Sequence, residues 1–434
     1  MQISQLYIYP IKSLRATSVT EGVLSPLGLK YDRCFMLLKV EDGEDGQGKG
    51  ATLKNMHVPH FPEMALFETA LDMPTAEDEG RVRVTYHPPP PSPNAKDPRP
   101  SETKHLEIPL KPNVDSLSRF TVTMHQSPTT GYNMGSAYND WFSECFGYPV
   151  VLAYLGVNTR GVLGTLAPAK AKHNGKKKKS GWARYEDLLR GLESVGASGT
   201  GPSVLEKLLV PICALAIGAS GVSYAAGQFE HGIGIANTYD SMSTSMAILA
   251  GIVTTALVLA GSIMIYIFGK RLRTAKYEDR ITFADCAPFL VISETSVNNV
   301  SGRLPAGEEM DRTKFRPNIV ISGAESAFEE DFWTELAIGS NRIRLLLTGN
   351  CVRCQSLNVD YRTGQMGDGE SGTVLKKLMK DRRVDRGARF SPVFGRYSFL
   401  DRGFDGEMVR VGDVVEVVAR GAERSVLDWP GLTN

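Results

Sequence analysis

Short apolar runs separated by glycine and proline fill the first 75 residues of the chain. Ile3, Leu6 and Ile8 stand among polar neighbours, and this spacing predicts a β-strand from the first residues onward. Several such runs in succession predict a β-barrel or sandwich. Within residues 136–147 the apolar side chains recur at helical spacing instead. We therefore expect residues 1–155 to form a small β-barrel-like domain with a helix near its end.

A similar pattern resumes at residue 277. A strand leading into a helix is predicted within residues 283–300, further strands within 315–323 and 334–349, a short helix within 373–383, and a closing strand pair within 406–418. The chain is therefore expected to be mainly β with some α (an α+β protein), with a second β-barrel domain over residues 277–420.

Two long apolar runs lie between these parts. Residues 208–227 and 246–268 contain no charged side chain, and each reaches the length of about 20 residues that spans a hydrocarbon core of about 30 Å. A pair of buried core helices is the alternative. The length, the absence of charge and the pairing favour two transmembrane helices.

The charges around the two runs predict their orientation. Lys176–Lys179 precede the first run and the basic stretch 270–276 follows the second, whereas the short connection between the runs has acidic residues and no lysine or arginine. By the positive-inside rule both outer flanks face the cytosol, so residues 205–269 are expected to form a transmembrane helical hairpin. Residues 156–204 are expected to be a basic, flexible linker, and the parts on either side can fold together.

The composition narrows the class of protein. Lys and Arg number 49 and Asp and Glu number 48, a balance that gives no reason to expect nucleic-acid binding. The six cysteines are scattered apart from one pair, which is not a disulfide framework and favours a reducing compartment. The N-terminus lacks the basic start and apolar run of a secretory signal.

The exception is the C-x-x-C formed by Cys351 and Cys354. A structural zinc site needs two further ligands, but none of the seven histidines lies near this pair or after it. A redox disulfide of the thioredoxin kind is expected at a helix start, whereas this pair follows a strand. A single soft thiolate that binds a metal with other ligands of its own fits better, although the disulfide stays open.

Six ordered stretches resemble MOSC-domain proteins, and most closely the branch with an N-terminal β-barrel that includes the mitochondrial amidoxime-reducing components and their bacterial relatives. The stretches are YPIKS (9–13), YDRCFML (31–37), DCAPFLVISETS (285–296), TKFRPNIVISG (313–323), CVRCQSLNVDYRTG (351–364) and RFSPVFGRYSFL (389–400). The resemblance identifies residues 277–420 as the MOSC domain. It implies a molybdenum cofactor, Mo-molybdopterin, bound through one cysteine.

The resemblance also implies roles for individual residues. Cys354 matches the catalytic cysteine that ligates molybdenum, and Arg353 beside it is expected to lower the pKa of the thiol. The other matched cofactor-binding positions are Lys12, Ser13, Arg33, Ser293, Arg316 and Asn318. The planar guanidinium of arginine can donate two parallel hydrogen bonds to phosphate and can stack on planar heterocycles. Cys286 and Asp285 are expected to be structural, and the role of Cys351 stays open.

The resemblance implies an oxidoreductase that reduces N-hydroxylated compounds such as amidoximes, and the predicted helical hairpin would anchor it in a membrane. The sequence has no G-x-G-x-x-G fingerprint after a strand, so electrons are expected from a partner of the cytochrome b5 type with its reductase. The anchored protein would face the cytosol from the mitochondrial outer membrane or the endoplasmic reticulum.

The alternative is a cofactor-binding or sulfur-carrier module without reductase activity, as in molybdenum-cofactor sulfurases. Those proteins add a pyridoxal-phosphate-dependent domain, for which we expect no room in this chain. Pyridoxal phosphate binding is therefore implied only at the level of the family.

Overall fold

The computed structural model describes residues 1–41, 50, 52–91, 99–168, 261 and 278–429. Met1–Gly175 and Glu278–Asn434 belong to one compact unit, and Lys176–Tyr277 are assigned to a second. Within the described ranges, no helix has the length and apolar character needed to cross a membrane. Apart from residue 261, the transmembrane helices predicted at 208–227 and 246–268 lie outside these ranges, as does most of the predicted linker, so they stay a prediction.

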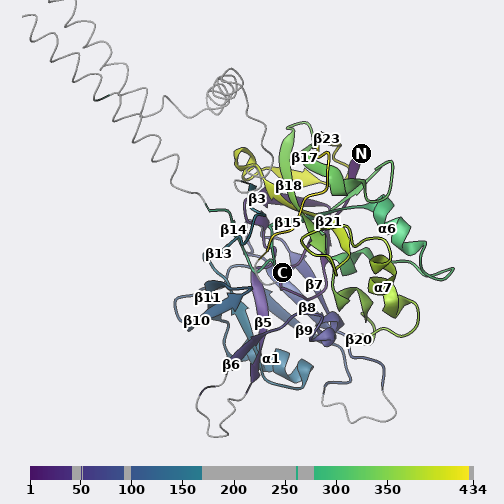
Figure 1. Ribbon diagram of the computed structural model, residues 1–434. Coiled ribbons are helices and arrows are strands. Elements are labelled where there is room, and N and C mark those ends of the chain that lie inside the picture. Colours follow the sequence, from purple (N-terminus) through teal and green to yellow (C-terminus); the bar gives the residue numbers. More distant parts are fainter. Residues whose placement is uncertain (42–49, 51, 92–98, 169–260, 262–277, 430–434) are drawn as a thin grey trace, which may run out of the picture. The chain divides into compact units, whose positions relative to one another are not determined.

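The described part of the chain is mainly β with few helices, as the sequence predicted (Figure 1). Its largest sheet runs in the order β2 (Thr17–Val19), β1 (Gln2–Ile8), β16 (Ile319–Ser322), β15 (Phe289–Ser293), β21 (Val393–Leu400), β18 (Ile343–Val352), β17 (Trp333–Ile338) and β23 (Val415–Arg420). β15 and β16 run parallel and are joined through helix α6 (Glu294–Ser301). The first two strands of the chain thus complete the sheet of the C-terminal half.

Backbone hydrogen bonds close this sheet into a barrel. The backbone N–H of Ile3 in β1 donates to the carbonyl of Asp413 at 2.9 Å, and that of Val415 in β23 donates to the carbonyl of Met1 at 2.9 Å. Gln2 and Val414 form an antiparallel bridge between them. Closure removes exposed sheet edges, which otherwise present unpaired backbone groups.

Apolar side chains fill both faces of the closed sheet. Along β15, Phe289 and Val291 belong to one buried cluster, whereas Leu290 and Ile292 belong to another on the opposite face. This division follows from the period of two along a strand. The cluster that contains Leu290 and Ile292, here called the outer cluster, lies beside the candidate site.

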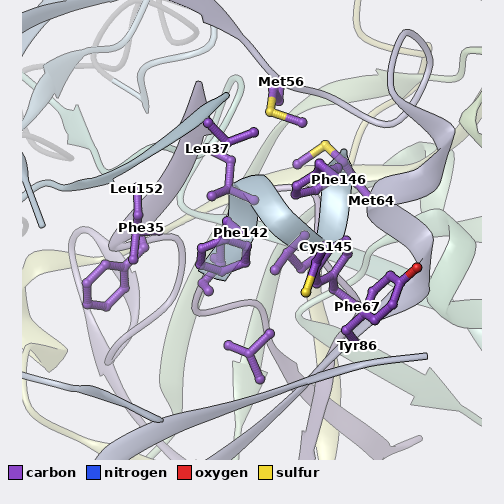
Figure 2. Close-up of a cluster of buried hydrophobic side chains, with 14 of the residues drawn as sticks. Phe35, Leu37, Met56, Met64, Phe67, Tyr86, Phe142, Cys145, Phe146 and Leu152 are labelled. Atoms are coloured by element: carbon purple, nitrogen blue, oxygen red, sulfur yellow. The ribbon is translucent and has the colours of Figure 1, made fainter. Parts of the chain in front are cut away.

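Two smaller sheets build the barrel-like N-terminal part. One has the order β10 (Arg119–Met124), β11 (Ser127–Asn133), β12 (Val150–Tyr154), β5 (Phe35–Glu41) and β6 (Thr52–Asn55), and the other the order β7 (Phe67–Asp72), β8 (Arg81–Tyr86) and β9 (Lys104–Pro109). Helix α1 (Ser136–Phe146) packs Phe142, Cys145 and Phe146 into their shared core (Figure 2). The helix predicted within residues 136–147 is confirmed.

The remaining elements are short. They are β3 (Glu21–Ser25), β4 (Gly28–Leu29), β13 (Arg160–Gly161), β14 (Arg280–Ile281), β19 (Val359–Asp360), β20 (Gln365–Met366), β22 (Met408–Arg410), helix α7 (Val374–Met379) and the 3-10 turns η1 (Pro62–Leu66), η3 (Arg312–Phe315), η4 (Glu329–Phe332), η5 (Gln355–Asn358), η6 (Ser371–Thr373) and η7 (Arg402–Phe404).

One strand pairing differs from the prediction. Both strands expected within 406–418 form, but β22 pairs with β3 and β23 pairs with β17, so they do not make a hairpin. The turn at Gly412 instead passes the chain from one sheet to another, where Gly412 donates to the carbonyl of Ile3. Local turn chemistry cannot distinguish a hairpin from such a crossing.

The chain on the two sides of residues 169–277 folds together, as expected. β13 pairs antiparallel with β14. Arg160 in β13 is 1% exposed, and its guanidinium donates to the carbonyls of Met124, Thr282 and Ala284. A buried arginine is tolerated only when its donors are satisfied, so these carbonyls hold the two segments together.

Glu330 in η4 is a buried carboxyl group near α6. One of its oxygens accepts a hydrogen bond from Ser296 Oγ at 2.8 Å, and the other has no partner among the described residues. Burial raises the pKa of Glu330 from 4.5 to about 7. Because the folded protein holds this proton more tightly than the unfolded chain does, the contribution of Glu330 to stability is lost as the pH rises from about 4.5 to about 7.

We therefore predict that Glu330→Gln removes a pH-dependent loss of about 3 kcal/mol in the free energy of unfolding between pH 4.5 and 7. Urea denaturation of wild type and variant at pH 5, 6, 7 and 8 measures this slope. The exposed Glu325→Gln serves as the control and is expected to keep the wild-type slope. An unchanged slope in Glu330→Gln would contradict the assignment.

Candidate functional site

A cavity of about 120 Å³ beside the outer cluster collects charged, amide and thiol groups. It is lined by Arg33, Ala284, Asp285, Cys286, Ala287, Leu290, Phe315, Arg316, Asn318, Cys351, Val352, Arg353, Cys354, Ser356 and Tyr397. A wider cleft of about 970 Å³ runs along the proline-rich segment 87–91, and no described residue of its lining is a cysteine. The chemistry in the smaller cavity makes it the candidate functional site.

The cavity brings together five of the eight residues singled out from the sequence, namely Arg33, Arg316, Asn318, Arg353 and Cys354. Lys12 reaches the cavity indirectly, because its ammonium contacts the carboxylate of Asp285 in the lining. Ser13 and Ser293 are buried but do not line the cavity. The Ser293 hydroxyl has no hydrogen-bond partner among the described residues.

A buried ion pair positions Arg33. Asp32 is 1% exposed, and it accepts hydrogen bonds from the Arg33 guanidinium and from the backbone N–H of Tyr9 at 2.8 Å. The same guanidinium donates to Asn318 Oδ1 at 3.2 Å and to the carbonyl of Arg316 at 3.3 Å. Arg33 is thus held by its neighbour Asp32 and by two groups of the segment before β16, the carbonyl of Arg316 and the amide of Asn318.

Asn318 joins this network to the barrel. Its Oδ1 also accepts from the backbone N–H of Leu290 in β15 at 3.2 Å, and its Nδ2 donates to the carbonyl of Tyr7 in β1 at 3.2 Å. A fully buried amide needs such partners for both its oxygen and its nitrogen. Asn318 therefore fixes Arg33 relative to two strands of the large sheet.

Two guanidinium groups lie against the ring of Tyr9. The carbon centre of Arg33 is 4.7 Å from the ring centroid and that of Arg316 is 4.4 Å away, both within cation–π range. Both arginines have a left-handed backbone conformation, with φ of 57° at Arg316 and 53° at Arg33. This conformation costs energy for residues other than glycine. Burial lowers the pKa of Arg316, and its Nη2 has no partner within the described residues.

The thiol groups of the cavity differ in exposure. Cys354 is exposed, with its Sγ 3.3 Å from Ser356 Oγ. Cys351 and Cys286 are buried. Burial raises the pKa of the Cys286 thiol well above its ordinary value, so Cys286 stays protonated. Cys354 is therefore the cavity thiol that can meet an external metal or reagent.

Arg353 contacts the first thiol of the pair and the segment before β16. Its Nη1 lies 2.8 Å from Cys351 Sγ and its Nη2 donates to the carbonyl of Phe315 at 2.9 Å. In extended chain, side chains two positions apart share a face and neighbours point to opposite faces. Arg353 and Cys351 therefore share a face. Burial would lower the pKa of Arg353, but the neighbouring groups, Cys351 first and Cys354 among them, outweigh it and raise that pKa. The effect of Arg353 on the Cys354 thiol stays a prediction.

Three cavity residues were missed or undervalued at the level of sequence: Asp285, Cys286 and Tyr397. The Tyr397 hydroxyl is hydrogen-bonded to the thiols of Cys286 and Cys351. Partial burial would raise the pKa of Asp285, but Lys12 and His125 outweigh it and hold that pKa well below its ordinary value. An isolated cysteine or aspartate beside a strand gives no periodic signal, so only the tertiary pairing reveals them.

The difference in exposure predicts an order of thiol reactivity. In cofactor-free protein, iodoacetamide should alkylate Cys354 at least about tenfold faster than Cys351, Cys286 or Cys145, because a buried thiol is inert. Peptide mass spectrometry at short times measures the order under native conditions. Labelling in denaturant is the control and should equalise the four sites. Equal native labelling of Cys351 and Cys354 would contradict the geometry.

Comparison with known proteins agrees with the two-part organisation of the fold. Residues 1–149 match the family model of the MOSC N-terminal beta barrel domain, and residues 278–416 match that of the MOSC domain. These ranges contain most of the strands described above, although β12 and the end of β23 lie just beyond them. They also contain every residue that lines the candidate site.

Similar proteins cover only part of the chain. Mitochondrial amidoxime-reducing component 1 of Homo sapiens is 35% identical over 147 residues, which is 33% of this chain and 40% of that protein. Mitochondrial amidoxime reducing component 2 of Rattus norvegicus is 39% identical over 136 residues (31% and 38%). Molybdenum cofactor sulfurase of Emericella nidulans is 34% identical over 158 residues (32% and 19%). The matches thus span two fifths or less of these relatives.

The resemblance read from six short stretches is confirmed by these matches. The two family domains follow one another in the same order as the two barrels, and the stretches fall within them. The chain is therefore a MOSC-domain protein with a MOSC N-terminal beta barrel domain.

Proposed function

We propose that this protein is a molybdenum-cofactor oxidoreductase that reduces N-hydroxylated compounds of the amidoxime type. One observation supports it above the others: an exposed thiol, Cys354, lies in a cavity where two of the arginines, Arg316 and Arg353, each have a buried donor nitrogen without a partner among the described residues. The names of the relatives, which refer to amidoxime reduction and to the molybdenum cofactor, favour the same reaction class.

The residues of the cavity fit such a cofactor. Arg316 Nη2 and Arg353 Nε are buried without a hydrogen-bond partner among the described residues, and an unsatisfied buried donor is costly unless a ligand accepts from it. A pterin with a terminal phosphate offers acceptors of both planar and anionic kinds. Cys354 would supply the soft thiolate that molybdenum prefers.

Different residues of the cavity would bind the cofactor and exchange protons with the substrate. Arg33 and Arg316, fixed against Tyr9, would hold the phosphate and pterin. When bound, the cofactor supplies a two-electron redox centre with a high affinity for oxygen atoms. Reduction of R–N–OH to R–NH consumes two electrons and two protons and releases water. Asp285, half-exposed at the rim, is placed to exchange a proton with the substrate hydroxyl.

Electrons would come from a partner protein of the cytochrome b5 type with its reductase, because the sequence lacks a nicotinamide or flavin fingerprint. We propose that residues 205–269 anchor the chain through two transmembrane helices. The pairing of β13 with β14 supports this, because it brings together the chain on the two sides of that segment. The mitochondrial names of the relatives favour a mitochondrial membrane over the endoplasmic reticulum.

A cofactor-binding or sulfur-carrier module is the second candidate. The match of 158 residues to a molybdenum cofactor sulfurase supports it. Such a module would bind the same cofactor through the same cavity but would not turn over amidoximes. Metal content and reductase activity together separate the two functions.

We predict that wild-type protein from a host that makes the cofactor contains stoichiometric molybdenum and reduces benzamidoxime when supplied with cytochrome b5 and its reductase. Cys354→Ser should lose at least about 99% of the activity, because removal of a group that acts at the reacting centre typically costs two or more orders of magnitude. Mass spectrometry of metal and chromatography of benzamidine give the two readouts.

Cys145→Ala is the matched control, because it removes a thiol from the core of the N-terminal part, and it should retain activity. Bound molybdenum with no reductase activity in the wild type would favour the carrier module. Absence of molybdenum from the wild type would contradict both functions and return attention to a disulfide between Cys351 and Cys354.

We also predict that Arg316→Lys lowers the bound pterin several-fold, since lysine cannot reproduce the planar guanidinium. Pterin fluorescence after denaturation of equal amounts of protein measures this. Arg312→Lys is the control, because Arg312 pairs with Glu294 at 2.7 Å and does not line the cavity. Equal pterin content in Arg316→Lys and wild type would remove Arg316 from the cofactor site.

A further inference from the structure

The chain between α7 and β21 folds into a closed loop (Figure 1). The backbone N–H of Val393 donates to the carbonyl of Arg382 at 2.8 Å, and Arg382 Nε donates to the carbonyl of Val393 at 3.2 Å. The Arg382 guanidinium also donates to both carboxylate oxygens of the buried Asp331 at 2.8 Å. These contacts fix the two ends of residues 382–393, here called the arginine loop.

A buried carboxylate holds the inside of the arginine loop. Asp385 is 2% exposed, and it accepts hydrogen bonds from the backbone N–H groups of Gly387 and Leu427 at 2.8 and 3.0 Å. It also accepts from Asn350 Nδ2 in β18 at 2.7 Å. Asp385 is the one acidic residue of the loop. Because it is buried and bonded to these donors, the loop presents no negative side chain to solvent.

The outer surface of the arginine loop is positively charged. Arg383, Arg386 and Arg389 are exposed, and none of their side chains has a hydrogen bond or ion pair with another residue that the structure describes. By contrast, the exposed Arg342 and Arg410 pair with glutamates at 2.7 and 3.2 Å. Three positive charges without a counter-charge on one short loop attract anionic groups and steer their approach.

The same loop carries an aromatic side chain in solvent. Phe390 is 82% exposed, whereas every other phenylalanine, tyrosine and tryptophan in the described ranges is buried or half-buried. The side chains that contribute most to binding at protein interfaces are typically aromatic residues and arginines. A phenylalanine among three arginines is therefore typical of a surface that contacts another protein.

The arginine loop is directly connected to the candidate site. Two residues after Phe390, the carbonyl of Pro392 accepts a hydrogen bond from the backbone N–H of Arg353 at 2.8 Å. Arg353 is bonded to Cys354, the exposed thiol of the cavity. Electron transfer between proteins slows exponentially with separation, and it is faster through bonds than across gaps. A donor on this loop is linked to the site by a few covalent bonds and one hydrogen bond.

We propose that the arginine loop is the surface on which the electron-donating protein docks, and that this donor presents acidic side chains around its haem. The inference rests on the proposed function, which takes electrons from a partner protein. Each turnover oxidises two ferrous haems to ferric haems, and their two electrons with two protons convert R–N–OH into R–NH and water. Contacts between electron-transfer proteins are among the smallest protein interfaces, so one loop can provide much of such a contact.

Neutralising the three arginines tests the docking surface. In full-length protein of equal molybdenum content, Arg383→Gln/Arg386→Gln/Arg389→Gln should lower kcat/KM for reduced cytochrome b5 about tenfold or more at low salt, because complementary charge governs association. Raising the salt from about 20 to about 200 mM should lower the wild-type value and remove most of the difference. Benzamidoxime reduction by reduced methyl viologen should be unchanged, since a small donor needs no docking surface. An unchanged kcat/KM for cytochrome b5 would overturn the proposal.

Arg83→Gln/Arg342→Gln/Arg410→Gln is the matched control. It changes the net charge equally but removes exposed arginines that already pair with carboxylates, and such pairs contribute little to stability. The control variant should keep the wild-type rates with both donors. Phe390→Ser should also lower kcat/KM for cytochrome b5, but it should leave the salt dependence as in the wild type because no charge is lost.

A second readout needs no turnover. Isothermal titration with oxidised cytochrome b5 should show binding about tenfold weaker in the loop variant than in wild type or control, because three charged contacts are lost. Vesicles of equal parts phosphatidylcholine and phosphatidylserine test a membrane contact instead. Loss of vesicle binding in the loop variant with unchanged cytochrome b5 binding would overturn the proposal. A wild type that binds cytochrome b5 through the loop but reduces no benzamidoxime with either donor would overturn the proposed function and keep the docking surface.

Discussion

The buried pair of Asp32 and Arg33 is the interaction on which the candidate site depends. Asp32 accepts from Tyr9 and from Arg33, so one carboxylate both ends the first strand and aims a guanidinium at the cavity. Asn318 then ties that guanidinium to β1 and β15. Removing one partner of a buried pair leaves an uncompensated charge, which typically costs about 3–5 kcal/mol. The site is therefore as rigid as the barrel that holds it.

The organisation of the fold explains why residues from the two ends of the chain meet. β1 belongs to the large sheet and pairs with β16, so the segment after β1, with Lys12 and Arg33 near it, lies beside the segment before β16, with Arg316 and Asn318. The parallel pair β15 and β16 places Asp285 and Leu290 next to them. The extended segment after β18 adds Arg353 and Cys354. Five segments that are far apart in the sequence, the fifth being β21 with Tyr397, thus supply one cavity.

Much of this could be predicted from sequence, because local periodicity reports strands and helices directly. The alternation in β1 and the helical spacing before Phe146 were read correctly. The contact of Arg353 with Phe315 was not foreseen, since it depends on which face of the extended chain meets that segment. The hairpin expected around Gly412 failed because both strands find partners far away in sequence. Cys286, Asp285 and Tyr397 became visible only through tertiary contacts, which no local pattern encodes.

We propose that Cys354 binds molybdenum in this cavity, while Cys351 is held by Arg353 and Tyr397. X-ray absorption at the molybdenum edge tests it most directly, with wild type beside Cys354→Ser and Cys351→Ser. The account predicts that the metal loses one sulfur neighbour in Cys354→Ser and keeps its full sulfur shell in Cys351→Ser. An unchanged sulfur shell in Cys354→Ser, or a loss in Cys351→Ser instead, would contradict it.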